Sequence, residues 1–368
     1  MMEVTEAGQH VESLKWDDLV AALRTGSIYQ TAAWAEAKGR RTDTRVVIDR
    51  RASGAGGPGR GEVAGARLLI RRIGPMVRAA YVSYGPLFTH PPNRSAVASI
   101  MTAVETEARA AGCAVLLVQP ARGDHETAGH LSALGYEPAP IDVAASATLV
   151  VDLGRADDEL FRDLTKSRRR NVRRAQRFGV SVVLGGRADL GVLDRLYSAS
   201  ARRHGFAAMS RSYLERQWDA LRPGGNMQLF LARLDGRTVA AAAMISFGDT
   251  VESKITGWDG TARARTCYVN DAVNWASITW ANHHGYHRFD LGGMPRDLAH
   301  RAEEIGVAEA VKGTGSEFKH GWGGRLAISP PTYHKVIRPS GHLTYGLGSR
   351  LLDDSGPGGR LVNWLRRT

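Results

Sequence analysis

One order of elements is predicted twice along the 368 residues of the chain. In each half, the apolar periodicity predicts two strands joined by a turn, a third strand, a helix and a fourth strand. The segments in the first half are 44–50, 62–73, 79–88, 93–111 and 114–120. Those in the second half are 227–234, 238–248, 250–258, 269–285 and 287–293. The repetition predicts a duplicated α/β unit, although a chance match of pattern or one continuous mixed sheet would give the same order.

The length of the chain also favours two domains, because 368 residues exceed what one ordinary core holds. The predicted fold class is α/β (α+β), with a mixed twisted sheet flanked by helices in each domain. Such a unit suggests the fold of acetyl-CoA-using acyltransferases, which bind the cofactor's pyrophosphate on an Arg/Gln-x-x-Gly-x-Gly/Ala loop. Residues 71–77, RRIGPMV, lack the last small residue of this loop, and residues 257–263, GWDGTAR, lack its leading Arg or Gln. The sequence therefore predicts the fold without this cofactor.

A run of positive charge lies at 166–180, KSRRRNVRRAQRFGV, and contains no acidic residue. Like charges three and four apart on a helix repel each other, so folding alone does not explain the run. Together with the net charge of +12, it predicts an anionic partner: nucleic acid, a phosphate-bearing substrate or a membrane surface. The alternatives are a solvated basic face and a proteome rich in arginine. Ser167 is predicted to cap this helix, and Arg168 lies on its apolar stripe, where it either extends to solvent or meets an anion.

Several classes of function are excluded by the sequence. It has no Ser-His-Asp, HExxH or Walker spacing, and Cys113 and Cys267 form neither a zinc site nor a disulfide framework. The N-terminus is polar and acidic, unlike a signal peptide, and no apolar run has the length of a membrane span. We therefore expect a cytoplasmic protein without a metal. The basic segment 359–368 is expected either to dock as a surface helix or to contact lipid or RNA.

Five segments occur in an order that is typical of one family. They are YQTAAWAEAKGR (29–40), YVSYGPLF (81–88), KSRRRNVRRAQRFGVSV (166–182), GYHRFDLGGMP (285–295) and EFKHGWGG (317–324). Between about residues 29 and 335, the chain resembles the FemABX family, whose members add amino acids from aminoacyl-tRNA to peptidoglycan precursors. It resembles the shorter members, because the segment between Tyr213 and Asn226 cannot hold the coiled-coil arm of the longer ones.

The resemblance implies two GNAT-like domains, one formed by 1–150 with about 328–368 and the other by 151–327. It implies no cofactor, with aminoacyl-tRNA as a co-substrate. The implied acceptor is a UDP-linked or lipid-linked muropeptide. The protein is expected to be a monomer in peripheral contact with the inner membrane surface.

The resemblance also assigns roles to individual residues. Phe318 and Lys319 match the family's Phe-Lys pair, whose lysine lies near the ester under attack and steadies its oxyanion. The residues expected to bind the acceptor are Lys38 and Arg211, which would contact the diphosphate, and Tyr213 and Gly85. Those expected to bind tRNA phosphates are Arg169, Arg170, Arg173 and Arg177, while Arg168, Asn171 and Asp290 are expected to be structural. For each lysine the alternative is an ordinary surface side chain, and no general base is evident.

Two stretches, SKITGWDG at 253–260 and TCYVNDAVNW at 266–275, depart from the family pattern. They leave the acceptor open. Besides cell-wall synthesis, two other functions remain: N-acylation of a secondary-metabolite amine with tRNA or CoA as donor, and non-catalytic binding of RNA or an anionic membrane.

Overall fold

A computed structural model describes residues 2–6, 10–23, 25–39, 42–49, 63–73, 77–140 and 142–338. The chain divides into two compact units, one formed by Met1–Ser146 with Ile328–Thr368 and the other by Ala147–Ala327. The glycine-rich stretch 51–61 and the basic segment 359–368 lie outside the described residues.

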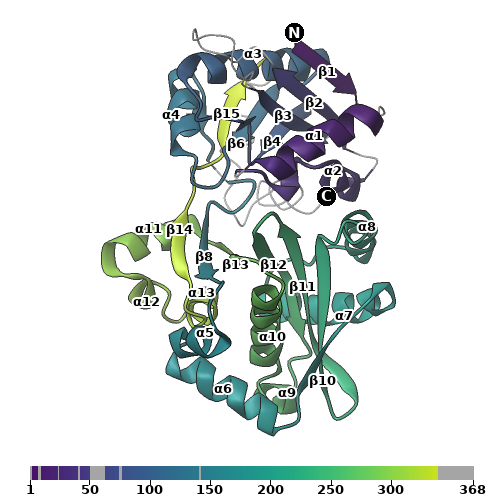
Figure 1. Cartoon of the computed structure of the whole chain (residues 1–368), viewed down its shortest axis with the longest axis vertical. Helices are drawn as coiled ribbons and strands as arrows, with labels where there is room; N and C mark the ends of the chain where they lie inside the picture. Colours follow the sequence, from purple (N-terminus) through teal and green to yellow (C-terminus); the bar gives the residue numbers. More distant parts are fainter. Residues whose placement is uncertain are drawn as a thin grey trace. The chain divides into compact units, whose positions relative to one another are not determined.

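The first unit is a mixed sheet with helices packed against it (Figure 1). The sheet order is β1-β2-β3-β4-β6-β15-β7, with β5 paired to β3. Strands β4 and β6 run parallel, and the other described pairs are antiparallel. The elements are β1 (Met2–Glu6), α1 (His10–Ala22), η1 (Ile28–Gln30), α2 (Ala32–Lys38), β2 (Asp43–Asp49), β3 (Ala64–Ile73), β4 (Val77–Ser83), β5 (Leu87–Phe88), α3 (Arg94–Ala110), β6 (Val115–Gln119), α4 (His125–Ala133), β7 (Glu137–Pro138) and β15 (Tyr333–Val336).

Helix α3 covers this sheet because its apolar residues recur at helical spacing. Val97, Ile100 and Val104 are fully buried against Leu68 of β3 and Leu116 of β6. The helix begins at a side-chain cap, where the Asn93 carboxamide oxygen accepts the Ala96 N–H at 2.9 Å. Strand β15 reaches this sheet from the far end of the chain and pairs with β6.

The second unit repeats the arrangement with a sheet in the order β14-β8-β13-β12-β11-β10-β9. Strands β12 and β13 run parallel, as β4 and β6 do in the first unit. The elements are β8 (Ala147–Asp152), α5 (Asp157–Asp163), α6 (Lys166–Arg177), β9 (Ser181–Leu184), η2 (Arg187–Asp189), α7 (Leu190–His204), α8 (Arg211–Leu221), β10 (Met227–Leu234), β11 (Arg237–Phe247), β12 (Thr250–Trp258), α9 (Ala262–Thr266), α10 (Val269–His283), β13 (Arg288–Met294), α11 (Arg296–Ile305), α12 (Val307–Ala310), α13 (Gly315–His320) and β14 (Arg325–Ile328).

Both faces of the second sheet are covered by helices, which explains the run of alanines in β11. Ala240 and Ala242 pack in one core with Val273 and Ile278 of α10. Side chains alternate between faces along a strand, so Ala241 and its partner Gly257 face the other way. On that face α7 approaches so closely that a Cβ on Gly257 would lie 2.4 Å from the Tyr197 backbone nitrogen.

These two sheets confirm the predicted duplication and exclude the single continuous sheet. One local prediction was wrong: α6 begins at Lys166, with Thr165 rather than Ser167 in the N-cap position. None of the helices in the described residues is long and apolar enough to cross a membrane. Nor do the described residues contain a cluster of three or more side chains that could hold a metal ion.

Candidate active site

The parallel strands of the second unit separate part of the way along their length. Strand β12 pairs with β13 only from Thr250–Arg288 to Glu252–Asp290. Beyond these pairs β12 follows β11 as far as Trp258, while β13 follows β8 as far as Met294. In the first unit, by contrast, the β4–β6 pairing continues to Ser83–Gln119. The second unit therefore has an opening between its two parallel strands, which we call the β12–β13 split.

Irregularities in both strands accompany the split. The β11–β12 register shifts between Ala243, which pairs with Ile255, and Met244, which pairs with Ser253, so that Lys254 is the bulged residue of β12. The β13–β8 register shifts between Asp290 and Gly293. Gly292 has a φ of 82°, in the left-handed region that favours glycine, and a Cβ there would lie 2.9 Å from the Ser253 carbonyl oxygen. The backbone at this point therefore requires glycine.

Lys319 reaches the split from the short helix α13. Its Nζ donates hydrogen bonds to the carbonyl oxygens of Gly292, at 3.1 Å, and Gly293, at 2.5 Å. Burial lowers the pKa of Lys319 to about 8, while the charge of Glu252 acts in the opposite direction. An ammonium has three N–H donors, so these two carbonyls leave one donor for a ligand oxygen.

An internal ion pair holds α13 in place. The Arg168 Nη1 lies 2.6 Å from the Asp271 carboxylate, and both side chains are largely buried. The Arg168 guanidinium also stacks over the ring of Phe318, 4.3 Å from its centroid. Asn171 donates a further hydrogen bond to Asp271 at 3.3 Å. The anion that Arg168 meets is therefore a carboxylate of α10, and Arg168 and Asn171 link three helices beside Lys319.

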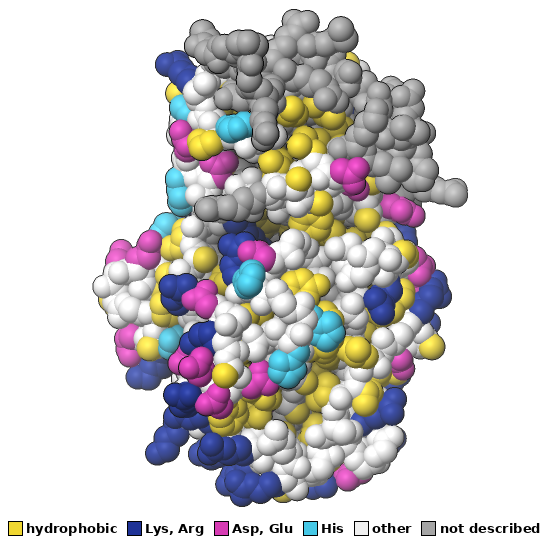
Figure 2. Space-filling view, in the orientation of Figure 1, with side chains coloured by type: hydrophobic (Ala, Val, Ile, Leu, Met, Phe, Trp, Pro, Cys, Tyr) yellow, Lys and Arg dark blue, Asp and Glu magenta, His cyan; other side chains and the backbone are white. Residues whose placement is uncertain are grey.

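The predicted tRNA-binding arginines of α6 have different environments. The Arg169 guanidinium donates to the backbone carbonyls of Arg162, at 2.6 Å, and Leu164, so it closes the end of α5. Arg173 is exposed and lies over the Phe161 ring, and Arg170 and Arg177 are exposed as well. Lys and Arg side chains gather at the lower left of the space-filling view, in the part of the view where Figure 1 draws α6 (Figure 2).

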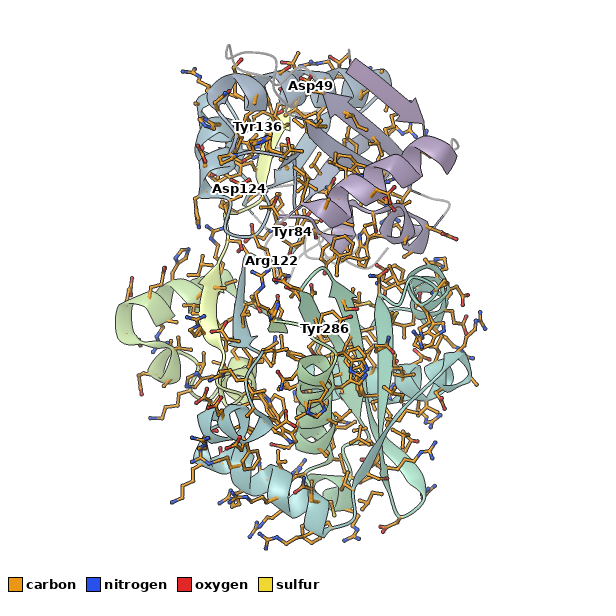
Figure 3. The ribbon with its side chains drawn as sticks, viewed as in Figure 1. Asp49, Tyr84, Arg122, Asp124, Tyr136 and Tyr286 are labelled. Atoms are coloured by element: carbon orange, nitrogen blue, oxygen red, sulfur yellow. The ribbon has the colours of Figure 1, made fainter. Side chains whose placement is uncertain are left out.

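Lys38, predicted to bind the acceptor, ends helix α2 of the first unit. Its side chain is mostly buried, and its Nζ lies 4.7 Å from the centroid of the Trp34 ring. Gly85 follows Tyr84, and the centroid of the Tyr84 ring lies 5.2 Å from the Arg122 guanidinium carbon (both residues are labelled in Figure 3). A Cβ on Gly85 would lie 3.1 Å from the Gln30 amide nitrogen, so close packing explains this glycine.

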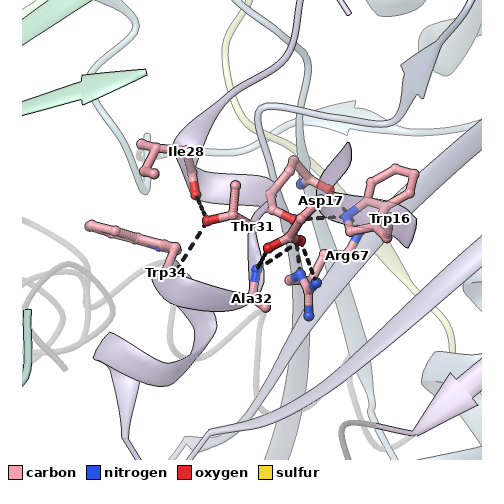
Figure 4. A network of polar contacts seen from close by, with 8 residues as sticks. Trp16, Asp17, Ile28, Thr31, Ala32, Trp34 and Arg67 are labelled. Carbon is pink, nitrogen blue, oxygen red and sulfur yellow. Dashed lines mark hydrogen bonds and ion pairs between the residues drawn. The ribbon is translucent and has the colours of Figure 1, made fainter. Parts of the chain in front are cut away.

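A polar network fixes the start of α2 (Figure 4). The Thr31 hydroxyl accepts the Trp34 N–H at 3.2 Å and donates to the Ile28 carbonyl at 2.7 Å. The Asp17 carboxylate accepts the Ala32 N–H at 2.9 Å and pairs with Arg67 at 3.2 Å. Burial raises the pKa of Asp17 even though Ala32 and Arg67 oppose it. The helix that carries Lys38 is thus capped at its first turn.

The other two predicted acceptor residues lie on α8 of the second unit. Arg211 is exposed at the start of the helix and pairs with Glu215 at 2.9 Å. Tyr213 is only 1% exposed, so its side chain is part of the core. Of this pair, only Arg211 is placed to meet a ligand.

Sequence reasoning missed two residues of the split. Glu252 ends the paired part of β12, and its carboxylate lies 3.7 Å from the Lys254 ammonium. Both side chains are largely buried, with 17% and 19% exposed. Residues 253–260 were noted in the sequence only because they depart from the pattern of the FemABX family. The electrostatic effect of Glu252 on Lys319 joins segments that lie more than 60 residues apart in the chain.

The turn after β12 lies where an acetyl-CoA-binding loop would hold the cofactor's pyrophosphate, but its donors are occupied. The Asp259 carboxylate accepts both the N–H of Thr261, at 2.9 Å, and its hydroxyl, at 3.0 Å. The Arg203 guanidinium occupies the space above Gly260, where a Cβ would lie 2.3 Å from its Nη1. The donors of this turn are already bound to an anion, whose charge would repel a pyrophosphate. The residues present therefore do not fit this group.

Comparison with known proteins agrees with the fold. Residues 162–303 match the family model described as an acetyltransferase (GNAT) domain. The crystal structure of FemX aligns with a TM-score of 0.74 at 18% identity, over 93% of this chain and 99% of that one. A tandem GNAT protein from the clavulanic acid biosynthesis pathway aligns with a TM-score of 0.53 at 14% identity, over 92% of this chain and 99% of that one. The fold is therefore that of tandem GNAT proteins.

The chain also resembles a glycyltransferase in sequence. The chain is 25% identical over 287 residues to the Lipid II:glycine glycyltransferase of Staphylococcus aureus, which covers 72% of this chain. The match spans 65% of that relative's length. The chain is thus similar in sequence to this glycyltransferase and in fold to FemX, and its residues 162–303 match a GNAT domain.

Proposed function

We propose that this protein transfers an amino acid from aminoacyl-tRNA to an amine of a lipid-linked or nucleotide-linked peptidoglycan precursor. The observation that carries the proposal is the position of Lys319 in the β12–β13 split, where two glycine carbonyls orient its ammonium. The relative named as a glycyltransferase acting on lipid II supports the choice of acceptor. The proposal includes a monomeric cytoplasmic enzyme that meets a lipid-linked acceptor at the membrane surface.

Lys319 would act on the carbonyl of the aminoacyl ester. When the acceptor amine attacks, negative charge develops on the ester carbonyl oxygen, and the free N–H of Lys319 would donate to it. A preorganised donor of this kind contributes about 3 kcal/mol in a site that excludes water. Since the Gly292 and Gly293 carbonyls already hold the ammonium, little reorganisation is needed as the charge appears.

Binding of the substrates is assigned to charged residues of both units. Arg170, Arg173 and Arg177 present cations on the exposed face of α6 and would bind phosphates of the tRNA acceptor stem without reading bases. Arg169 is left out of this set because its guanidinium is bound to the end of α5. Lys38 and Arg211 are proposed to contact the diphosphate of the acceptor, whereas the packing of Tyr213 and Gly85 supports structural roles for these two residues.

The test is a transfer assay with the full chain. Aminoacyl-tRNAs charged with a labelled amino-acid mixture are incubated with UDP-MurNAc-pentapeptide or lipid II, and label is followed into the acceptor. Lys319→Ala is expected to lower kcat by about 100-fold or more. The matched control is Lys312→Ala, which removes a lysine that is 72% exposed and paired with Glu309 at 3.8 Å, and it should leave transfer unchanged.

Two outcomes would contradict the proposal. If neither acceptor is labelled but the tRNA is deacylated faster than in buffer, the donor stands and the acceptor is a small-molecule amine. If tRNA only binds, in a salt-dependent way and without turnover, the protein is a binding protein and not a transferase.

A further inference from the structure

Glu252 lies at the point where the β12–β13 split begins. It forms the last parallel pair with Asp290 before the strands separate. Paired residues of neighbouring parallel strands point to the same face of the sheet, so the two carboxyl groups are neighbours. The Glu252 carboxylate also acts electrostatically on the Lys319 ammonium. It therefore faces Asp290 on β13, Lys254 on its own strand and Lys319 from α13.

Asp290 is a poor candidate for a group that binds the substrate, because its carboxylate already accepts hydrogen bonds from the protein. Its Oδ1 accepts the Thr148 hydroxyl and the Gly292 N–H, the latter at 2.8 Å. The residue has no exposed surface. Asp290 thus shapes the backbone around Gly292. Glu252 keeps 17% of its side chain exposed, and its carboxylate lies 3.7 Å from the Lys254 ammonium.

Aminolysis of an ester needs both a proton donor and a proton acceptor. The oxyanion needs a donor, and the amine must lose a proton as it attacks. Lys319 cannot fill both roles in one step, because the ammonium that donates to the oxyanion has no lone pair. Glu252 is a partly exposed carboxylate that acts electrostatically on this ammonium. Resting on the proposed function, we infer that Glu252 is the catalytic base, which takes the proton from the attacking acceptor amine.

The step balances without another reactant. The amine nitrogen forms a bond to the ester carbonyl carbon, and its proton moves to a Glu252 oxygen. The C–O bond to the ribose then breaks, and Glu252 returns the proton to the ribose oxygen that leaves. The products are an amide and a free ribose hydroxyl, and the carboxylate is regenerated. Lys254 lies close enough to stabilise the ionised form of Glu252 between turnovers.

The experiment compares Glu252→Gln with wild type in the same transfer assay, under single-turnover conditions between pH 6 and 9, corrected for spontaneous ester hydrolysis. General-base catalysis is typically worth about 10²–10⁴-fold, so we expect kcat to fall by at least about 100-fold while the acceptor KM changes less than about threefold. Glu252→Asp, which keeps a carboxylate, should restore part of the rate.

The control is Glu309→Gln, which removes an exposed carboxylate of the same unit. If Glu252→Gln keeps the wild-type kcat and pH profile, or if it changes only KM, the inference is wrong and the proposed function stands. If the wild-type protein labels neither acceptor, both the proposed function and the inference about Glu252 are wrong. Circular dichroism of each variant separates these outcomes from misfolding, and a folded Glu252→Asp with partial activity supports the role directly.

Discussion

Replacement of Arg168 by methionine tests whether the ion pair with Asp271 holds the second unit together. The substitution keeps much of the aliphatic side chain but leaves the Asp271 carboxylate buried beside one remaining amide, that of Asn171. Breaking a buried ion pair from one side typically costs 3–5 kcal/mol. Because 17% of Arg168 and 7% of Asp271 remain exposed, we expect a loss of about 3 kcal/mol at pH 7.5.

The pH dependence of this loss has a definite sign. Burial raises the pKa of Asp271, and Arg168 opposes that effect. Without the guanidinium, the pKa of the carboxyl rises further, and a proton can neutralise it as the pH falls. The destabilisation should therefore shrink between pH 7.5 and pH 5. The double variant Arg168→Met/Asp271→Leu removes both charges and should lose less stability than Arg168→Met alone.

The measurement is urea unfolding of the full chain, followed by tryptophan fluorescence, because five of the chain's tryptophans lie in the second unit: Trp218, Trp258, Trp275, Trp280 and Trp322. Midpoints are compared at constant slope across the single and double variants. A loss below about 1 kcal/mol for Arg168→Met, or additive effects in the double variant, would refute the reasoning. The same variant should also slow transfer, since Arg168 supports the helix of Lys319 through Phe318.

Two further predictions concern the other unit and the split. Burial opposes the charge of Glu105, but hydrogen bonds from Lys335, at 2.7 Å, and Tyr136 outweigh it, so its pKa is lowered below the usual 4.5. The lowered pKa stabilises the fold above pH 4.5 and the effect is lost as the pH falls further. Lys335→Met should therefore cost about 2 kcal/mol at pH 7 and approach wild type in acid, measured by thermal unfolding across pH; a pH-independent loss would contradict this. Gly292→Ala should cost about 1–3 kcal/mol and abolish transfer, because its Cβ would meet the Ser253 carbonyl beside Lys319. Gly285→Ala, at a φ of 79° with nothing within 4 Å, is the control for backbone strain and should keep activity.

Much of the fold could be predicted because the apolar periodicity of a segment indicates whether it forms a strand or a helix. The predicted strand at 250–258 coincides with β12 (Thr250–Trp258), and the helix predicted over 269–285 is α10 (Val269–His283). Both follow from side-chain periodicity, which depends on near neighbours in the chain. The N-cap of α6 was predicted at Ser167 and lies two residues earlier, at Thr165. Ser and Thr are both good caps, so local chemistry does not choose between them.

The candidate site was predictable only in part. The Phe-Lys pair at 318–319 could be located from its motif, but the burial of Tyr213 could not, because a tyrosine in an amphipathic helix suits a core as well as a binding surface. The sequence placed Arg168 on an apolar stripe but did not identify the anion that it meets. Its partner Asp271 lies 103 residues further on.

By itself, the sequence determined two α/β units in one chain, the basic helix after the first unit and the lysine at the end of the Phe-Lys motif. Only the tertiary structure decided where β12 and β13 separate and which side chains meet there. Lys319 meets the carbonyls of Gly292 and Gly293 because a helix and a strand from different segments are brought together by the register of the sheet. Such a register depends on the packing of the whole sheet, which no local pattern contains.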